Sequence, residues 1–204
     1  MDEVETREQK LLRVLYHLAR VEIAQMSTGF VATSGKAQIV KPLQSPLTKR
    51  ECIAYQLSIF YRPTSQAYNW LQIPDIYQCS DFFLGDDTGE ARVVGSRAEV
   101  ALVHPQNIQT YHQPIDLRHI LSPLGYHQEA AAAWSVHECV LLDGDETFVA
   151  GVASREPVPG TQGGYRDTPQ SRSVLQCQDG LPLAVSNNRV VRTTSPENVS
   201  PHTL

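Results

Sequence analysis

The sequence has no long apolar run. No stretch approaches the ~20 apolar residues that a helix needs to cross a bilayer. The first residues, Met1 to Glu5, are acidic and polar, whereas a signal peptide begins with basic residues and continues into an apolar run. We therefore expect a chain that is neither inserted into a membrane nor exported by a signal of its own, and we expect it in the cytoplasm.

Cysteine is scarce as well. The chain has four cysteines that lie far apart: Cys52, Cys79, Cys139 and Cys177. They form no Cys-x-x-Cys or Cys-x-x-His pair, which are spacings that zinc sites use, and they lack the density of a secreted disulfide framework. The sequence therefore predicts reduced thiols and no metal held by cysteine.

The chain also lacks the excess of Lys and Arg that is typical of nucleic-acid-binding proteins. It has 17 Lys and Arg against 22 Asp and Glu, which gives a formal net charge of -5. Neither of the glycine-rich phosphate-binding motifs occurs, and a Gly-x-Ser-x-Gly nucleophile motif is absent. From these absences we expect no nucleic-acid partner and no cofactor.

The sequence does contain short apolar runs separated by turn residues. The run from Cys52 to Tyr61 is rich in β-branched and aromatic residues and predicts a strand. Three pairs of runs flank turns rich in Gly and Asp and predict hairpins. These pairs are 82–84 with 91–94, 138–142 with 147–152, and 174–177 with 181–185.

Two short helices are expected at 114–121 and 128–134. The predicted fold is therefore mainly β, a barrel-like or sandwich-like domain of antiparallel hairpins with one or two short inserted helices. We expect this domain to cover residues 25–192 and a disordered tail to follow at 193–204.

Residues 1–24 have a helical period. Leu11, Leu15 and Leu18 recur at steps of four and three residues, with most charged residues elsewhere around the wheel, which predicts an N-terminal amphipathic helix. Three partners for this apolar stripe stay open: the β-domain itself, another protein, or a membrane surface in peripheral contact. The polar face carries both signs of charge, whereas membrane-surface helices usually favour Lys and Arg.

A second candidate contact surface lies in the middle of the chain. Tyr68, Trp70 and Ile73 are set between Pro63 and Pro74, in a segment that predicts a loop or irregular hairpin. Exposed aromatic residues on loops are common interface anchors, so these three residues are candidates for binding a partner. The alternative is that they cover one end of the β-domain.

Cys52 is the residue most easily interpreted as a nucleophile. It follows Lys49 and Arg50, whose charges would lower the pKa of a thiol. It also begins an apolar strand, where a buried cysteine behaves as a small hydrophobic residue. The second interpretation is favoured, and the first leaves a thiol-dependent hydrolase as an alternative function.

The segment from His104 to His137 is rich in histidine. Within it, His119 lies one helical turn from Asp116, which suggests a metal site but supplies too few ligands. Solvated histidines are the favoured interpretation, with a metal-dependent hydrolase as the alternative. For Glu138, one alternative is an ion pair across the sheet with Arg92 or Arg189.

Six elements follow one another in a recognisable order. They are a glycine-containing strand at 35–40, the bend Pro42-Leu43-Gln44-Ser45-Pro46-Leu47, the strand Cys52-Ile53-Ala54-Tyr55, hairpins at 83–93 and 138–151, and a closing strand at 181–186. Together they resemble the GIDE domain, the membrane-adjacent domain of mitochondrial RING-type ubiquitin ligases and their prokaryotic and plant relatives. The resemblance covers 23–191.

This resemblance implies recognition of a protein partner or assembly of a complex, with a membrane or ligase component as a candidate partner. Members of the family are similar in carrying transmembrane helices beside the domain, and the ligases add a zinc-binding RING. This sequence contains neither, so no ubiquitin-ligase chemistry is carried over. The expected function is a non-enzymatic protein-binding or scaffolding module.

Overall fold

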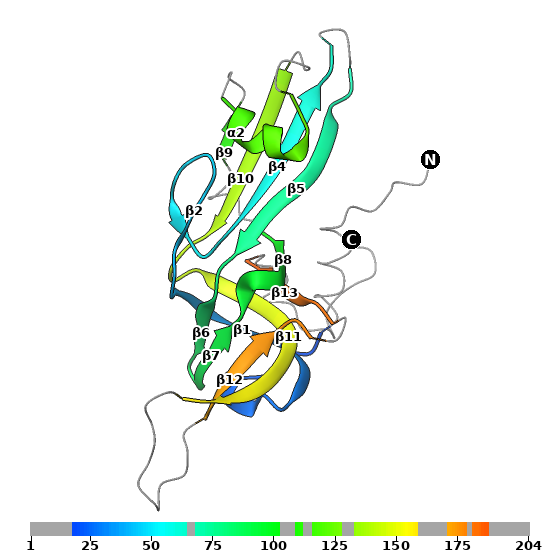
Figure 1. The fold of residues 1–204 in the computed structure, drawn as a ribbon. Coiled ribbons are helices and arrows are strands. Elements are labelled where there is room, and N and C mark those ends of the chain that lie inside the picture. Colours follow the sequence, from blue (N-terminus) through cyan, green and yellow to red (C-terminus); the bar gives the residue numbers. More distant parts are fainter. Residues whose placement is uncertain are drawn as a thin grey trace, which may run out of the picture.

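β-Strands make up most of the regular structure. The computed structural model describes residues 18–64, 68–102, 109–111, 116–127, 133–158, 171–178 and 181–187. Within these ranges the strands form a seven-stranded sheet, a four-stranded sheet and a two-stranded ribbon (Figure 1). The expectation of a mainly β protein with a barrel and a short inserted helix is confirmed.

Five strands of the larger sheet close into a barrel. Their order around the barrel is β1 (Gly29–Ile39), β6 (Phe82–Asp86), β7 (Gly89–Val93), β12 (Ser171–Gln176) and β11 (Glu146–Pro157). β11 pairs with β1 and closes the ring. The β7–β12 pair is parallel, and the other four pairs are antiparallel. With its third and fifth strands adjacent and parallel, the barrel has the topology of an OB-fold.

The barrel interior is apolar and tightly packed. Phe82, Leu84, Val149 and Leu175 are each 0% exposed within it. Gly35 on β1 belongs to the same wall, and a Cβ atom there would lie 2.3 Å from the carbonyl oxygen of Gly85. Only glycine fits at this position, which explains the glycine of the first motif element.

Two further strands join the barrel sheet beside the first half of β11, on the same edge as β12. They are β13 (Leu183–Ser186), which pairs antiparallel with β11, and β8 (Ala98–Ala101), which pairs parallel with β13. The prediction that the last two runs form one hairpin is wrong, because β12 and β13 pair one after the other along the same edge of β11, opposite β1, and not with each other; the Gln178–Leu181 bridge closes the turn between them.

The second sheet is built from two insertions between barrel strands. Its order is β5 (Leu71–Cys79), β4 (Ala54–Arg62), β10 (Ala133–Leu141) and β9 (Gln109–Tyr111). β4 and β5 lie between β1 and β6 in the chain, and β9 and β10 lie between β7 and β11. Pairing of β4 with β10 joins the two insertions into one sheet, which stands above the barrel in Figure 1.

Short elements complete the second sheet. They are the ribbon of β2 (Leu43–Gln44) and β3 (Glu51–Cys52), the helix α2 (Arg118–Leu121) and the 3-10 turn η3 (Ser122–Leu124). Leu117 and Leu121 pack on Leu57, Ile59 and Ile73, so α2 covers one face of the sheet. The prediction of a short helix at 114–121 is confirmed at 118–121; residues 116 and 117 are not helical, and 114 and 115 lie outside the described residues.

The described chain begins with residues 18–26, which cross the barrel and are called the strap. Arg20 forms a parallel bridge to Ala32 of β1, and the 3-10 turn η1 (Ile23–Gln25) follows. Ile23 and Met26 are 2% and 4% exposed and join the barrel core. The predicted helix over 1–24 is therefore wrong for 18–24, because burial of Ile23 in the barrel core goes with a bridge and a 3-10 turn instead of an α-helix. The first seventeen residues of the prediction lie outside the described ranges.

Two other predictions meet the limits of the description. The helix expected at 128–134 is wrong at Ala133 and Trp134, which begin β10, and its remainder lies outside the described residues. The tail predicted at 193–204 also lies outside them. Among the helices that the structure describes, none is long and apolar enough to cross a bilayer.

Candidate functional site

Glu138 is the most buried acidic residue of the motif elements, at 1% exposed. Its carboxylate accepts hydrogen bonds from the amides of Leu47 (2.8 Å) and Thr48 (3.1 Å) and from the hydroxyls of Ser45 (3.1 Å) and Thr48. The carboxylate thus holds the Ser-Pro-Leu-Thr turn against β10. Glu138 does not pair with Arg92, which bonds to other carboxylates, and Arg189 lies outside the described residues.

Asp86 holds the strap in the same way. One oxygen accepts the amide of Ile23 at 2.9 Å, and the other accepts the amides of Thr88 and Gly89 at 2.8 and 3.0 Å. Burial alone would raise the pKa of Asp86, but the hydrogen bonds from Thr88, Ile23 and Gly89 lower it. The β6–β7 turn therefore clamps the N-terminal strap.

The turn between β10 and β11 docks on β1. Asp143 accepts the amide of Ile39 at 2.7 Å, and Gly144, with a φ of 80°, donates its amide to the carbonyl of Ala37 at 2.7 Å. Asp145 accepts the amide of Leu142 at 2.9 Å. These acidic motif residues therefore bind backbone amides and hold the fold together.

Cys52 is poorly placed for nucleophilic chemistry. Its side chain is 0% exposed, and burial followed by the charge of Glu138 raises the pKa of its thiol to about 11, although Arg50 lowers it. The reactive form of cysteine is the thiolate, which such a pKa suppresses near neutral pH. All four cysteines are free thiols.

The histidine segment shows no assembled metal site in its described part. Arg118 donates two side-chain hydrogen bonds to Asp116, at 2.9 and 2.8 Å, and lowers the pKa of that carboxyl to about 2. Asp116 is thus engaged by Arg118, its neighbour in sequence. Across the described residues, no group of three or more His, Cys, Asp or Glu side chains is arranged to hold a metal ion. His104 and His112 lie outside those residues.

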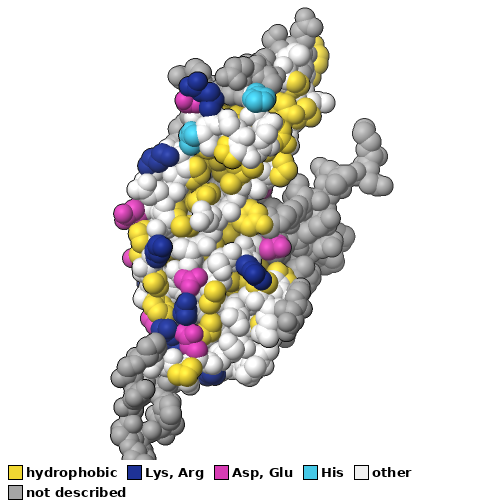
Figure 2. Space-filling view, in the orientation of Figure 1, with side chains coloured by type: hydrophobic (Ala, Val, Ile, Leu, Met, Phe, Trp, Pro, Cys, Tyr) yellow, Lys and Arg dark blue, Asp and Glu magenta, His cyan; other side chains and the backbone are white. Residues whose placement is uncertain are grey.

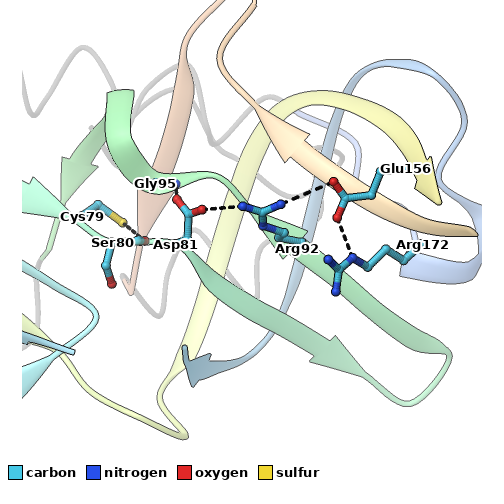
Figure 3. A network of polar contacts seen from close by, with 7 residues as sticks. All are labelled: Cys79, Ser80, Asp81, Arg92, Gly95, Glu156 and Arg172. Carbon is cyan, nitrogen blue, oxygen red and sulfur yellow. Dashed lines mark hydrogen bonds and ion pairs between the residues drawn. The ribbon is translucent and has the colours of Figure 1, made fainter. Parts of the chain in front are cut away.

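The outer face of the barrel carries a charged network (Figure 3). Arg92 on β7 donates to Asp81 at 2.8 Å and to Glu156 on β11 at 3.4 Å, and Arg172 on β12 donates to Glu156 at 2.6 Å. Asp81 also accepts the amide of Gly95 at 3.0 Å. Because both guanidinium groups face carboxylates, the network links β7, β11, β12 and the connection before β6 without presenting an excess of positive charge.

The far end of the second sheet exposes large apolar side chains. Tyr68 is 99% exposed, Trp70 43% and Leu71 46%. The guanidinium carbon of Arg62 lies 5.6 Å from the centre of the Trp70 ring, a cation–π contact that holds the ring in place. We call Arg62, Tyr68, Trp70 and Leu71 the aromatic end. Figure 2 shows hydrophobic side chains gathered along this edge of the molecule, over β5.

The residues predicted to contact a partner do not lie together in the structure. Tyr68 and Trp70 lie at the aromatic end, whereas Ile73 is 1% exposed, pairs with Ile59 of β4 and packs in the core beneath α2. Ile73 is therefore a core residue, and its assignment as a contact residue is corrected. Leu18 is half-buried against the outer face of the barrel, and Leu11 and Leu15 lie outside the described residues.

Sequence reasoning missed two members of the aromatic end. Leu71 follows Trp70 directly within the segment between Pro63 and Pro74, and Arg62 immediately precedes that segment. The signal for both was their position next to the aromatic residues and prolines. No family model, curated protein or solved structure matches this chain, so the resemblance to the GIDE domain stays a prediction from the motifs.

Proposed function

We propose that this chain is a non-enzymatic protein-binding or scaffolding module that contacts its partner through the aromatic end. The observation that supports this proposal most directly is the exposure of Tyr68, Trp70 and Leu71 within four consecutive residues. Soluble proteins bury most of their large aromatic side chains, and interface hot spots are enriched in Trp, Tyr and Arg. The four residues of the aromatic end contain three of these types.

The strands beneath the aromatic end are extensively paired. Arg62 ends β4 and Leu71 begins β5, and these strands pair from Tyr61 and Leu71 down to Ala54 and Cys79. β4 also pairs with β10 over nine residue pairs, from Arg62 with Ala133 to Ala54 with Leu141. Contact residues that are held in place before binding lose less conformational freedom on association, which favours affinity.

The nature of the partner follows from the same residues. The aromatic end carries one cation and no acidic group, so its attraction is mainly apolar, with Arg62 available to a carboxylate or carbonyl of the partner. By its resemblance to the GIDE domain, we propose a protein partner, with a membrane or ligase component as the first candidate. A cytoplasmic location and an adaptor role are part of this proposal.

A hydrolase that uses Cys52 is the weaker alternative, because the raised pKa of this thiol opposes nucleophilic attack. A membrane-surface adaptor that uses the predicted N-terminal helix is the other alternative. Binding of the full chain to anionic phospholipid vesicles, compared between the native sequence and Leu11→Ser/Leu15→Ser, tests that alternative directly.

The test of the proposal is partner recovery from extracts of the native cell. The immobilised full chain is compared with Tyr68→Ala/Trp70→Ala/Leu71→Ala, and enriched proteins are quantified by mass spectrometry. We expect one set of proteins to be enriched by the native chain and lost with the triple variant, because the variant removes the exposed apolar contact.

The matched control is Phe30→Ala/Val40→Ala/Leu181→Ala. These residues are 38%, 52% and 45% exposed and lie on or beside the barrel sheet. The control variant is expected to retain the enriched proteins. Equal recovery by the native chain and the aromatic-end variant, with both folded by circular dichroism, would contradict the proposal.

A further inference from the structure

An apolar cluster lies on the outer face of the barrel sheet. Ala32, Ala101, Phe148, Ala150 and Ala184 form it, one or two from each of β1, β8, β11 and β13. Side chains alternate between the two faces of a strand, and Val149 points into the barrel core, so Phe148 and Ala150 point outward. These five outward residues are nevertheless only 0% to 2% exposed.

The strap is seated on this cluster. Leu18 packs against it, and the guanidinium carbon of Arg20 lies 5.2 Å from the centre of the Phe148 ring. The amide of Val21 donates to the carbonyl of Ala32 at 2.9 Å, which fixes the strap beside β1. Residues 1–17 therefore precede a residue, Leu18, that already packs against the alanine-rich cluster.

The sequence of the preceding segment suits this cluster. Leu18 belongs to the predicted apolar stripe, which also holds Leu11 and Leu15. In a helix, Leu11 and Leu15 would lie on one face about 6 Å apart. Four adjacent strands span about 14 Å, so both side chains fit within the width of the cluster. Alanine side chains allow a helix to pack closely on a sheet, whereas larger side chains on the sheet surface would hold the helix further away.

We propose that residues 1–17 form an amphipathic helix that docks on this alanine-rich cluster of its own chain through Leu11 and Leu15, directly before Leu18, which already packs there. The occupant is the N-terminal segment itself, because the stripe residue that follows it already lies on the cluster and the cluster is closed to solvent. The N-terminal stripe is thus part of the fold, and partner binding is left to other surfaces.

Photo-crosslinking of the full chain tests this docking. A benzoylphenylalanine is placed at position 15 on the stripe or, as a control, at position 13 on the opposite side of the predicted helix. After irradiation, crosslinked peptides are mapped by mass spectrometry. We expect position 15 to crosslink within one chain to peptides that contain Phe148, Ala150 or Ala184, and position 13 to give several-fold less of these products. Crosslinks between two chains, crosslinks to another face, or none from position 15 would overturn the proposal.

Thermal unfolding provides a second readout that does not need the crosslinker. Leu15→Ser should lower the Tm of the full chain by about 5 °C, because it removes a buried apolar contact, while Arg13→Ser should leave it within about 1 °C. Equal Tm values for Leu15→Ser and the native chain would show that the stripe is not docked.

Discussion

At the scale of single residues, acidic side chains act mainly as acceptors for backbone amides. Glu138, Asp86 and Asp143 each receive an amide from a segment that is distant in sequence. Hydrogen bonds to charged groups contribute about 1.5 to 3 kcal/mol each, more than neutral ones. The acidic positions of the motif elements therefore have a structural explanation that needs no catalysis.

The strongest of these contacts predicts the effect of one substitution. Glu138→Gln should lower the free energy of unfolding by about 2 to 3 kcal/mol, because the amide nitrogen cannot accept the hydrogen bonds that one carboxylate oxygen receives. Urea denaturation measures the change. Glu51→Gln, at an exposed position of β3, is the matched control and should stay within about 0.5 kcal/mol of the native chain. Equal stabilities for the two variants would contradict the role of Glu138.

The cysteines make a second prediction at this scale. The pKa of Cys52 is raised to about 11, and burial raises that of Cys79 to about 12. Both should resist a thiol reagent in the native protein at mildly alkaline pH, while the half-buried Cys177 reacts first. Reaction rates followed residue by residue by mass spectrometry provide the test. Rapid modification of Cys52 in the folded chain would favour the hydrolase alternative.

At the scale of elements, local sequence predicts turns well and strand pairing poorly. The hairpin of β6 with β7 follows from a turn that contains Gly and Asp. The hairpin predicted for 138–142 with 147–152 is wrong, because β10 pairs with β4 and β9 while β11 pairs with β1, β12 and β13; the turn between them, at Leu142 to Asp145, is present. The parallel pairs β7–β12 and β8–β13 have no local signal, because nothing near a strand tells which distant strand lies beside it. The consecutive pairing of β12 and β13 along one edge of β11 is not predicted for the same reason.

The candidate site was predictable to a similar extent. Tyr68 and Trp70 were singled out because aromatic residues lie between prolines. Ile73 was misplaced because its burial depends on Ile59 and on Leu117 beside α2, which come from other parts of the chain. Which side chains of the second sheet are exposed depends on how far α2 and Leu117 cover it, and the local sequence does not contain that information.

The β6–β7 turn makes a prediction that belongs to an element. Asp86→Asn should lower the stability near neutral pH by about 1 kcal/mol, because the carboxylate accepts amides from the strap and the turn. The pKa of Asp86 is lowered from 3.8 in the folded chain, so this stabilisation is present above 3.8 and is lost as the pH falls through the folded-state pKa.

The difference between the native chain and Asp86→Asn should therefore shrink in acid. Denaturation of both proteins at neutral and at acidic pH measures it. Asp87→Asn is the matched control, since Asp87 lies exposed in the same turn, and it should show little effect at either pH. A stability difference for Asp86→Asn that stays constant down to strongly acidic pH would contradict the clamp.

At the scale of the whole molecule, a barrel carries a second sheet made from two of its connections. Ala54, Cys79 and Leu141 join the barrel core at one end of that sheet, while Arg62 and Leu71 lie at its other end. The sheet therefore holds the aromatic end away from the barrel (Figure 1). An arm of paired strands with exposed aromatic residues at its far end is an arrangement suited to contact with another protein.

The central claim is that the aromatic end contacts the partner. Once a partner has been recovered, its dissociation constant is measured by calorimetry for the native chain, Trp70→Ala and Leu181→Ala. We predict that Trp70→Ala weakens binding about tenfold or more, as expected for a hot-spot residue, and that Leu181→Ala changes it less than about twofold. Equal dissociation constants for the native chain and Trp70→Ala would contradict the account.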